Sequence, residues 1–131
     1  MKGRHETVID KRPVNLDLAS FRWPITAMAS MPHRISGFVL FLAIPVVLWV
    51  LQESLASQQS YDALQILLSG TFAKLILWVI MAGLIYHFVA GIKHLIIDVG
   101  IGESLEGARR LAFLTLGISA VLILAAGVWI W

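Results

Sequence analysis

Residues 35–52, I-S-G-F-V-L-F-L-A-I-P-V-V-L-W-V-L-Q, contain no Asp, Glu, Lys or Arg. Two further uncharged runs follow, at residues 75–92 and 111–131. A helix needs about 20 mostly apolar residues to cross a hydrocarbon core about 30 Å thick. Backbone polar groups in lipid must be paired within their own segment, so each isolated run is expected to be helical. The sequence therefore predicts an all-α integral membrane protein with three transmembrane helices, near residues 31–52, 72–97 and 110–130.

The overall composition agrees with this prediction. Of the 131 residues 59% are hydrophobic and 14% are charged, whereas a soluble domain is nearer half apolar and a quarter charged. We expect a cytoplasmic or interfacial N-terminal segment over residues 1–29 and one membrane anchor domain over 30–131. The first apolar run follows a long charged lead, which excludes a cleavable signal peptide. Because the chain has no cysteine, disulfides, thiolate metal sites, iron–sulfur ligation and C-x-x-C-H haem attachment are excluded.

The basic residues predict the orientation in the membrane. Positively charged residues stay on the cytoplasmic side, and of the ten Lys and Arg only Lys74 lies in or near the connection between the first two spans. The N-terminus is therefore expected in the cytoplasm and the C-terminus on the far side. The tryptophans support this orientation, because four of the five lie near the predicted outer ends of the spans, as in an aromatic belt. The nine basic residues on the inner side are Lys2, Arg4, Lys11, Arg12, Arg22, Arg34, Lys93, Arg109 and Arg110.

Two local features concern the shape of the chain. The polar connection 53–70 predicts an outer loop or a short surface helix. Pro45 lies inside the first span, where it is expected to kink the helix or leave a carbonyl group unpaired. The glycine-rich segment V-G-I-G-E-S-L-E-G begins at Val99. Its glycine spacing does not match the G-x-G-x-x-G pattern of nucleotide-binding sites.

Ionisable residues at membrane depth are rare and usually functional, and His87 is the most deeply placed histidine. Helical spacing puts it on one face with Gly83, Ala90, Gly91 and His94. Small residues beside a histidine let a flat ligand such as a porphyrin approach the backbone, but they equally suit a neighbouring helix. His87 is accordingly a candidate axial ligand to haem iron. A hydrogen bond to a carbonyl group on the next helix, or a proton relay, would also account for it.

Other polar residues gather at the predicted cytoplasmic ends of the first two spans. His33, Arg34 and His94 either extend to lipid headgroups or surround an anion such as the haem propionates, which arginine binds through two parallel hydrogen bonds. Ser30 lies four residues before Arg34 on the same helix face, where a hydroxyl group could hydrogen-bond a quinone carbonyl. Three membrane-level histidines are too few for two haems, so any haem is expected to be single, with its second ligand on another chain.

Two motifs resemble a known family. The segment S-M-P-H-R-I-S-G at 30–37, preceded by R-P-V-N-L-D-L at 12–18, matches the S-x-x-H-R-x-S-G pattern of the succinate dehydrogenase cytochrome b subunit. The segment H-F-V-A-G-I-K-H-L-I-I-D at 87–98 is similar to the second motif of that family, H-x-x-x-G-[apolar]-[basic]-H-x-x-x-D. The resemblance covers residues 11–131 and places both motifs in the expected order.

The resemblance implies an assembly and a cofactor. A second small three-helix subunit would pack against this chain, and the two would anchor a flavoprotein and an iron–sulfur subunit to the bacterial inner membrane. One haem b would lie between the anchors with one axial histidine from each, here His87 as the ligand to the haem iron. Membrane lipids are expected to contact the chain, and nucleic acid is not expected to bind it.

The resemblance also implies roles for individual residues. Ser30 and Arg34 would line the ubiquinone site, and His33, Arg34 and His94 would lie near the propionates. Asp98 closes the second motif at the cytoplasmic surface. The family often has arginine where this chain has Lys93, and lysine keeps the charge but loses the bidentate fork.

The sequence therefore predicts the membrane anchor of a succinate:ubiquinone oxidoreductase, which passes electrons from the iron–sulfur partner to quinone and is not a complete enzyme alone. The anchor of a quinol:fumarate reductase is the closest alternative, because that enzyme catalyses the same reaction in the opposite direction. A small proton-relay or transporter subunit, with His87 and His94 as titrating groups, is an alternative from another class.

Overall fold

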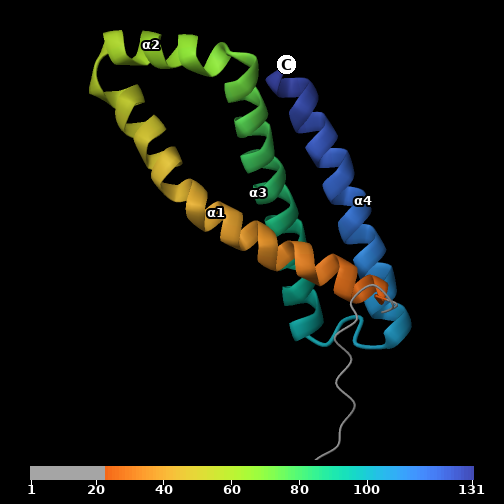
Figure 1. Ribbon diagram of the computed structural model, residues 1–131. Coiled ribbons are helices and arrows are strands. Elements are labelled where there is room, and N and C mark those ends of the chain that lie inside the picture. Colours follow the sequence, from red (N-terminus) through yellow and green to blue (C-terminus); the bar gives the residue numbers. More distant parts are fainter. Residues whose placement is uncertain (1–22) are drawn as a thin grey trace, which may run out of the picture.

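The computed structural model describes residues 23–131, and within that range the chain forms helices joined by short turns, with no strand. The helices are α1 (Ile25–Ala56), α2 (Gln58–Ser69), α3 (Thr71–Asp98) and α4 (Leu105–Ile130); Figure 1 shows their arrangement. Within the described range α1, α3 and α4 are long and apolar enough to cross a membrane, which confirms the predicted fold class. The motif at 12–18 and the five basic residues up to Arg22 lie outside the described residues.

The first spanning helix extends beyond the predicted 31–52 at both ends. It begins after Pro24, whose carbonyl oxygen accepts hydrogen bonds from the N–H groups of Ala27 and Met28 at 2.9 and 3.1 Å. It then continues through Pro32 and Pro45 to Ala56. Its 32 residues correspond to about 48 Å at 1.5 Å per residue, longer than a hydrocarbon core of about 30 Å. The helix is therefore long enough for both of its ends to extend beyond the hydrocarbon core.

The polar connection forms the short helix α2, one of its two predicted forms. Ser57 caps this helix by accepting a hydrogen bond from the N–H of Ser60, and the Ser60 hydroxyl accepts one from the N–H of Ser57. The Ser60 hydroxyl also lies 2.8 Å from the carbonyl oxygen of Glu53, to which it donates. These bonds fix the corner between α1 and α2, and in Figure 1 α2 runs across from the end of α1 to the start of α3.

A glycine turn joins α3 to α4 and explains why α4 starts before the predicted residue 110. Gly100 and Gly102 adopt φ angles of +87° and +83°, a region that other residues rarely enter. Ser104 then caps α4 by accepting a hydrogen bond from the N–H of Gly107 at 3.1 Å. Because the cap precedes the apolar run, the helix includes the charged turn that carries Glu106.

The three spanning helices pack together mainly through small residues. α3 and α4 lie side by side, and the N-terminal half of α1 crosses them (Figure 1). The fully or almost fully buried positions are few, and most large apolar side chains on all three helices are exposed. These outer surfaces therefore fit lipid or partner subunits rather than water. The buried residues of α1, α3 and α4 are Ala29, Ser36, Ala43, Ala90, Lys93, Ala112, Thr115 and Ser119.

Trp78, one of the tryptophans expected near the outer ends of the spans, also joins α3 to α4. Trp78 on α3 donates a hydrogen bond from Nε1 to the carbonyl oxygen of Ile123 on α4 at 3.0 Å. Its ring meets Trp131 edge-on at a centroid distance of 6.4 Å. Trp129, by contrast, is 80% exposed, as expected of a residue that faces lipid or headgroups.

Candidate functional site

The imidazole of His87 lies in the seam between α3 and α1. Its Nδ1 atom is 3.2 Å from the carbonyl oxygen of His33 and 3.3 Å from the hydroxyl oxygen of Ser36. The Ser36 hydroxyl donates to the same carbonyl oxygen at 2.8 Å, so Ser36 Oγ can accept the proton of Nδ1. With the proton on Nδ1, the Nε2 atom carries the lone pair that a metal ligand needs.

Gly37 makes the position of this imidazole possible. A Cβ atom added at Gly37 would lie 3.0 Å from Cε1 and 3.4 Å from Nδ1 of His87. Alanine at this position would therefore require the ring or the helix to move by a few tenths of an ångström. Ser36 and Gly37 were not singled out in the sequence for His87, although both belong to the S-x-x-H-R-x-S-G motif.

The glycine and alanine residues around His87 pack against α1. A Cβ atom at Gly83 would meet Leu40 at 4.0 Å, and one at Gly91 would meet Nε2 of His33 at 3.9 Å. Ala90 has no exposed surface. Of the two interpretations of this small-residue face, contact with a neighbouring helix is the one seen at Gly83 and Gly91.

The three membrane-level histidines form a row. The rings of His33 and His87 are stacked with centroids 4.3 Å apart, and the rings of His33 and His94 are 5.1 Å apart. His33 therefore lies beside His87 as well as beside His94. Stacked rings at 4.3 Å leave no gap for a porphyrin between them, so in this arrangement His33 and His87 cannot bind opposite faces of one haem. No group of three or more His, Cys, Asp or Glu within residues 23–131 is arranged to hold a metal ion by itself.

Ser30 and Arg34 lie on the flank of α1 that adjoins this seam. Helical spacing places Ser30, Arg34 and Gly37 in one row, and Gly37 is the residue in contact with His87. Ser30 is half-buried and Arg34 is exposed. Within residues 23–131 Arg34 forms no salt bridge, so its guanidinium group is available to a ligand or partner.

The side chain of Lys93 is buried, whereas Asp98 is exposed. Lys93 is only 6% exposed and has no hydrogen bond or salt bridge within the described part of the chain. Six helical residues put it about 120° around α3 from His87. Its burial was not expected from the sequence, because lysines near a helix end usually extend toward water.

A further hydrogen bond holds α1 against α3. The hydroxyl group of Tyr86 donates to the carbonyl oxygen of Ala29 at 2.8 Å. Ala29 is fully buried, and the bond joins the first turns of α1 to the residue directly before His87. Neighbouring residues of α3, Tyr86 and His87, are thus both held by hydrogen bonds to main-chain carbonyl groups of α1.

Known proteins are similar to this chain in sequence. A family model described as succinate dehydrogenase/fumarate reductase transmembrane subunit matches residues 9–126. The chain belongs to this family. It is a multi-pass inner-membrane protein of the succinate dehydrogenase cytochrome b type, with three membrane-spanning helices.

Individual relatives match over most of their length. The succinate dehydrogenase cytochrome b556 subunit of Coxiella burnetii is 44% identical over 122 residues, which cover 92% of this chain and 98% of the relative. The cytochrome b556 subunit of Paracoccus denitrificans is 30% identical over 99 residues, or 76% of each chain. The cytochrome b560 subunit of Reclinomonas americana is 30% identical over 124 residues, 91% of this chain and 85% of the relative.

Proposed function

We propose that the chain is the membrane anchor of a succinate:ubiquinone oxidoreductase, in which His87 is an axial ligand to haem b and Ser30 and Arg34 form part of the quinone site. One observation carries the proposal. The Nδ1 atom of His87 is held by the carbonyl oxygen of His33 and by Ser36, which reserves Nε2 for a metal. Metal-binding histidines usually donate their other ring N–H to such a carbonyl group.

The second axial ligand is proposed to come from a second small three-helix anchor subunit. His33 is stacked on His87 and cannot serve from the opposite side of a porphyrin. On α3 the flank next to His87 carries exposed apolar side chains, Leu84, Phe88 and Leu95, which are 50%, 66% and 66% exposed. These side chains offer the partner subunit an apolar surface, and a haem between the subunits would be shielded from water.

The cationic and polar groups around His33 suit the haem propionates. Along α3, His94 lies about 10 Å from His87 toward the cytoplasmic end, at 1.5 Å per residue. His33 contacts both rings, and Arg34 follows it on α1. Together His33, Arg34 and His94 would hold two carboxylates, with the arginine able to bind one of them through two hydrogen bonds.

Ser30 and Arg34 are proposed to bind ubiquinone. The Ser30 hydroxyl would donate a hydrogen bond to a quinone carbonyl oxygen, and the guanidinium group of Arg34 would stabilise negative charge that develops there during reduction. Electrons would arrive from the iron–sulfur partner, which receives them from succinate through the flavoprotein. When bound, haem b would supply a one-electron redox group beside this site.

The orientation follows from the distribution of basic residues. The N-terminal segment 1–29 is proposed to lie at the cytoplasmic surface, where the iron–sulfur and flavoprotein subunits dock, although residues 25–29 already belong to α1. Residues 30–131 form the anchor domain in contact with membrane lipids. Turnover in the direction of succinate oxidation is supported by the names of the three relatives above, each a succinate dehydrogenase cytochrome subunit.

Purification of the complex through a tag on this chain tests the proposal. We expect a flavoprotein, an iron–sulfur protein and one other small membrane protein to co-purify, with one haem b per copy of this chain. Purification without haem and without a flavoprotein would contradict the proposal. It would favour the proton-relay alternative, in which protons would pass along the row of histidines, His33, His87 and His94.

A further inference from the structure

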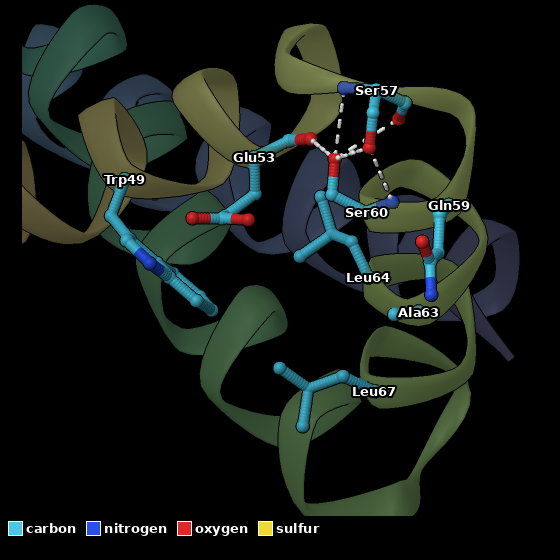
Figure 2. Close-up of a pocket in the computed structure, with 8 residues that line it drawn as sticks. All are labelled: Trp49, Glu53, Ser57, Gln59, Ser60, Ala63, Leu64 and Leu67. Atoms are coloured by element: carbon cyan, nitrogen blue, oxygen red, sulfur yellow. Dashed lines mark hydrogen bonds between the residues drawn. The ribbon is translucent and has the colours of Figure 1, made fainter.

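A pocket at the α2 end of the molecule has no role in the haem or quinone chemistry. It lies between the last turns of α1 and the helix α2, at the opposite end of α1 from Ser30 and Arg34, and has a volume of about 370 Å³. Small-molecule sites typically occupy about 300–1,000 Å³. Figure 2 shows Trp49 and Glu53 on one side of this pocket and Leu64 and Leu67 on the other.

Trp49 and Glu53 form a pair suited to a cation. They are four residues apart on α1 and so share a face, and Figure 2 shows both side chains extending from α1 on the same side of the pocket. Within residues 23–131 this carboxylate has no hydrogen bond or salt bridge, since only the main-chain carbonyl of Glu53 is bonded, by Ser60. A carboxylate and an indole face both attract an ammonium group.

The charge around the pocket favours a cationic over an anionic group. Glu53 is the only charged residue among those that line it. Lys74 is the only Lys or Arg between residues 35 and 92, and it does not line the pocket. A purely anionic headgroup would therefore meet a negative charge with no positive partner.

The location identifies a lipid as the source of the ammonium group. The pocket lies where α1 leaves the membrane, and tryptophan is enriched at the headgroup level. Leu64 and Leu67 provide apolar contact for the glycerol and upper acyl region. The amide of Gln59 also lines the pocket (Figure 2), and its N–H groups can donate to a phosphate oxygen.

We propose that this pocket binds the headgroup of an ethanolamine phospholipid, whose ammonium group lies between the Glu53 carboxylate and the Trp49 indole. The phosphate would lie at the rim beside Gln59. The site would anchor the corner between α1 and α2 in the headgroup layer, independently of the haem and of the quinone.

Lipid retention by the purified complex tests the proposal. The complex is delipidated in detergent, mixed with phosphatidylethanolamine or phosphatidylglycerol, and the bound lipid is counted by native mass spectrometry. Glu53→Gln preserves shape and the main-chain carbonyl that Ser60 binds. Asp62→Asn is the matched control, because Asp62 is an exposed α2 carboxylate outside the pocket that accepts a bond from Gln58.

We expect Glu53→Gln to lower phosphatidylethanolamine retention about threefold to fivefold and Trp49→Leu to lower it about twofold to threefold. Asp62→Asn should leave retention unchanged, and phosphatidylglycerol retention should not respond to Glu53→Gln. Equal retention in Glu53→Gln and the unmodified complex would overturn the proposal. So would an equal loss in Asp62→Asn, or a lysine of a partner subunit found against Glu53 in an experimental structure of the complex.

Discussion

Gly37→Ala is predicted to displace His87 and so to weaken haem binding. The new Cβ atom would lie 3.0 Å from Cε1 of the imidazole, closer than a normal carbon contact of about 3.5–4.0 Å. Relief requires the ring or the helix to shift by several tenths of an ångström. Overpacking of this kind costs about 1–3 kcal/mol, whereas alanine in place of glycine inside a helix contributes about 0.5–1 kcal/mol of stability.

Gly117→Ala is the matched control for this experiment. Gly117 lies inside α4, and an added Cβ atom there would meet nothing within 4 Å. The control therefore gains helix stability without the overlap, and the free energy of unfolding should differ between the two variants by about 1–3 kcal/mol. We expect the haem content of the purified complex to fall in Gly37→Ala and to stay constant in Gly117→Ala.

The assays are thermal unfolding of the complex and the haem-to-protein ratio from its visible spectrum. Equal melting temperatures and equal haem content in Gly37→Ala and Gly117→Ala would refute the placement of His87 against Gly37. A loss of haem in both variants would show that the change acts through general packing rather than through the imidazole.

Three further predictions address the quinone site, the support of His87 and the turn. Ser36→Ala should shift the haem midpoint potential and lower haem affinity about 10-fold or more, since it removes a hydrogen-bond partner of His87. Ser54→Ala loses only a hydrogen bond to its own helix and should change neither the potential nor the affinity. Arg34→Leu should lower ubiquinone reduction while an artificial dye is still reduced, and Arg109→Leu should spare both; equal loss with both acceptors would indicate failed assembly. Gly102→Ala should destabilise the complex by more than about 1–2 kcal/mol in thermal unfolding, because φ is +83° there and left-handed backbone disfavours a Cβ atom; an unchanged melting temperature would contradict the turn geometry.

The number of spanning helices could be predicted from the sequence because the bilayer imposes a minimum length of apolar chain. Their ends could not, since these depend on caps rather than on hydropathy. Ser104 starts α4 before the apolar run begins, and Pro24 lets α1 begin at Ile25.

For the candidate site, the sequence predicted which residues take part but not how they contact one another. The period of the helix put His87 and His94 on one face, and the motifs located Ser30 and Arg34. The stacking of His33 on His87 and the contact with Gly37 depend on the register of α1 against α3, which no single-helix pattern contains. The burial of Lys93 likewise depends on where three helices meet.

The most direct test of the central claim is the reduced-minus-oxidised visible spectrum of the complex that carries His87→Ala. His5→Ala, outside both motifs, controls for loss of a histidine. We expect the b-type band to be lost or altered in His87→Ala and intact in His5→Ala, while the other subunits still co-purify. An unchanged b-type band in His87→Ala would contradict the assignment of His87 as the haem ligand.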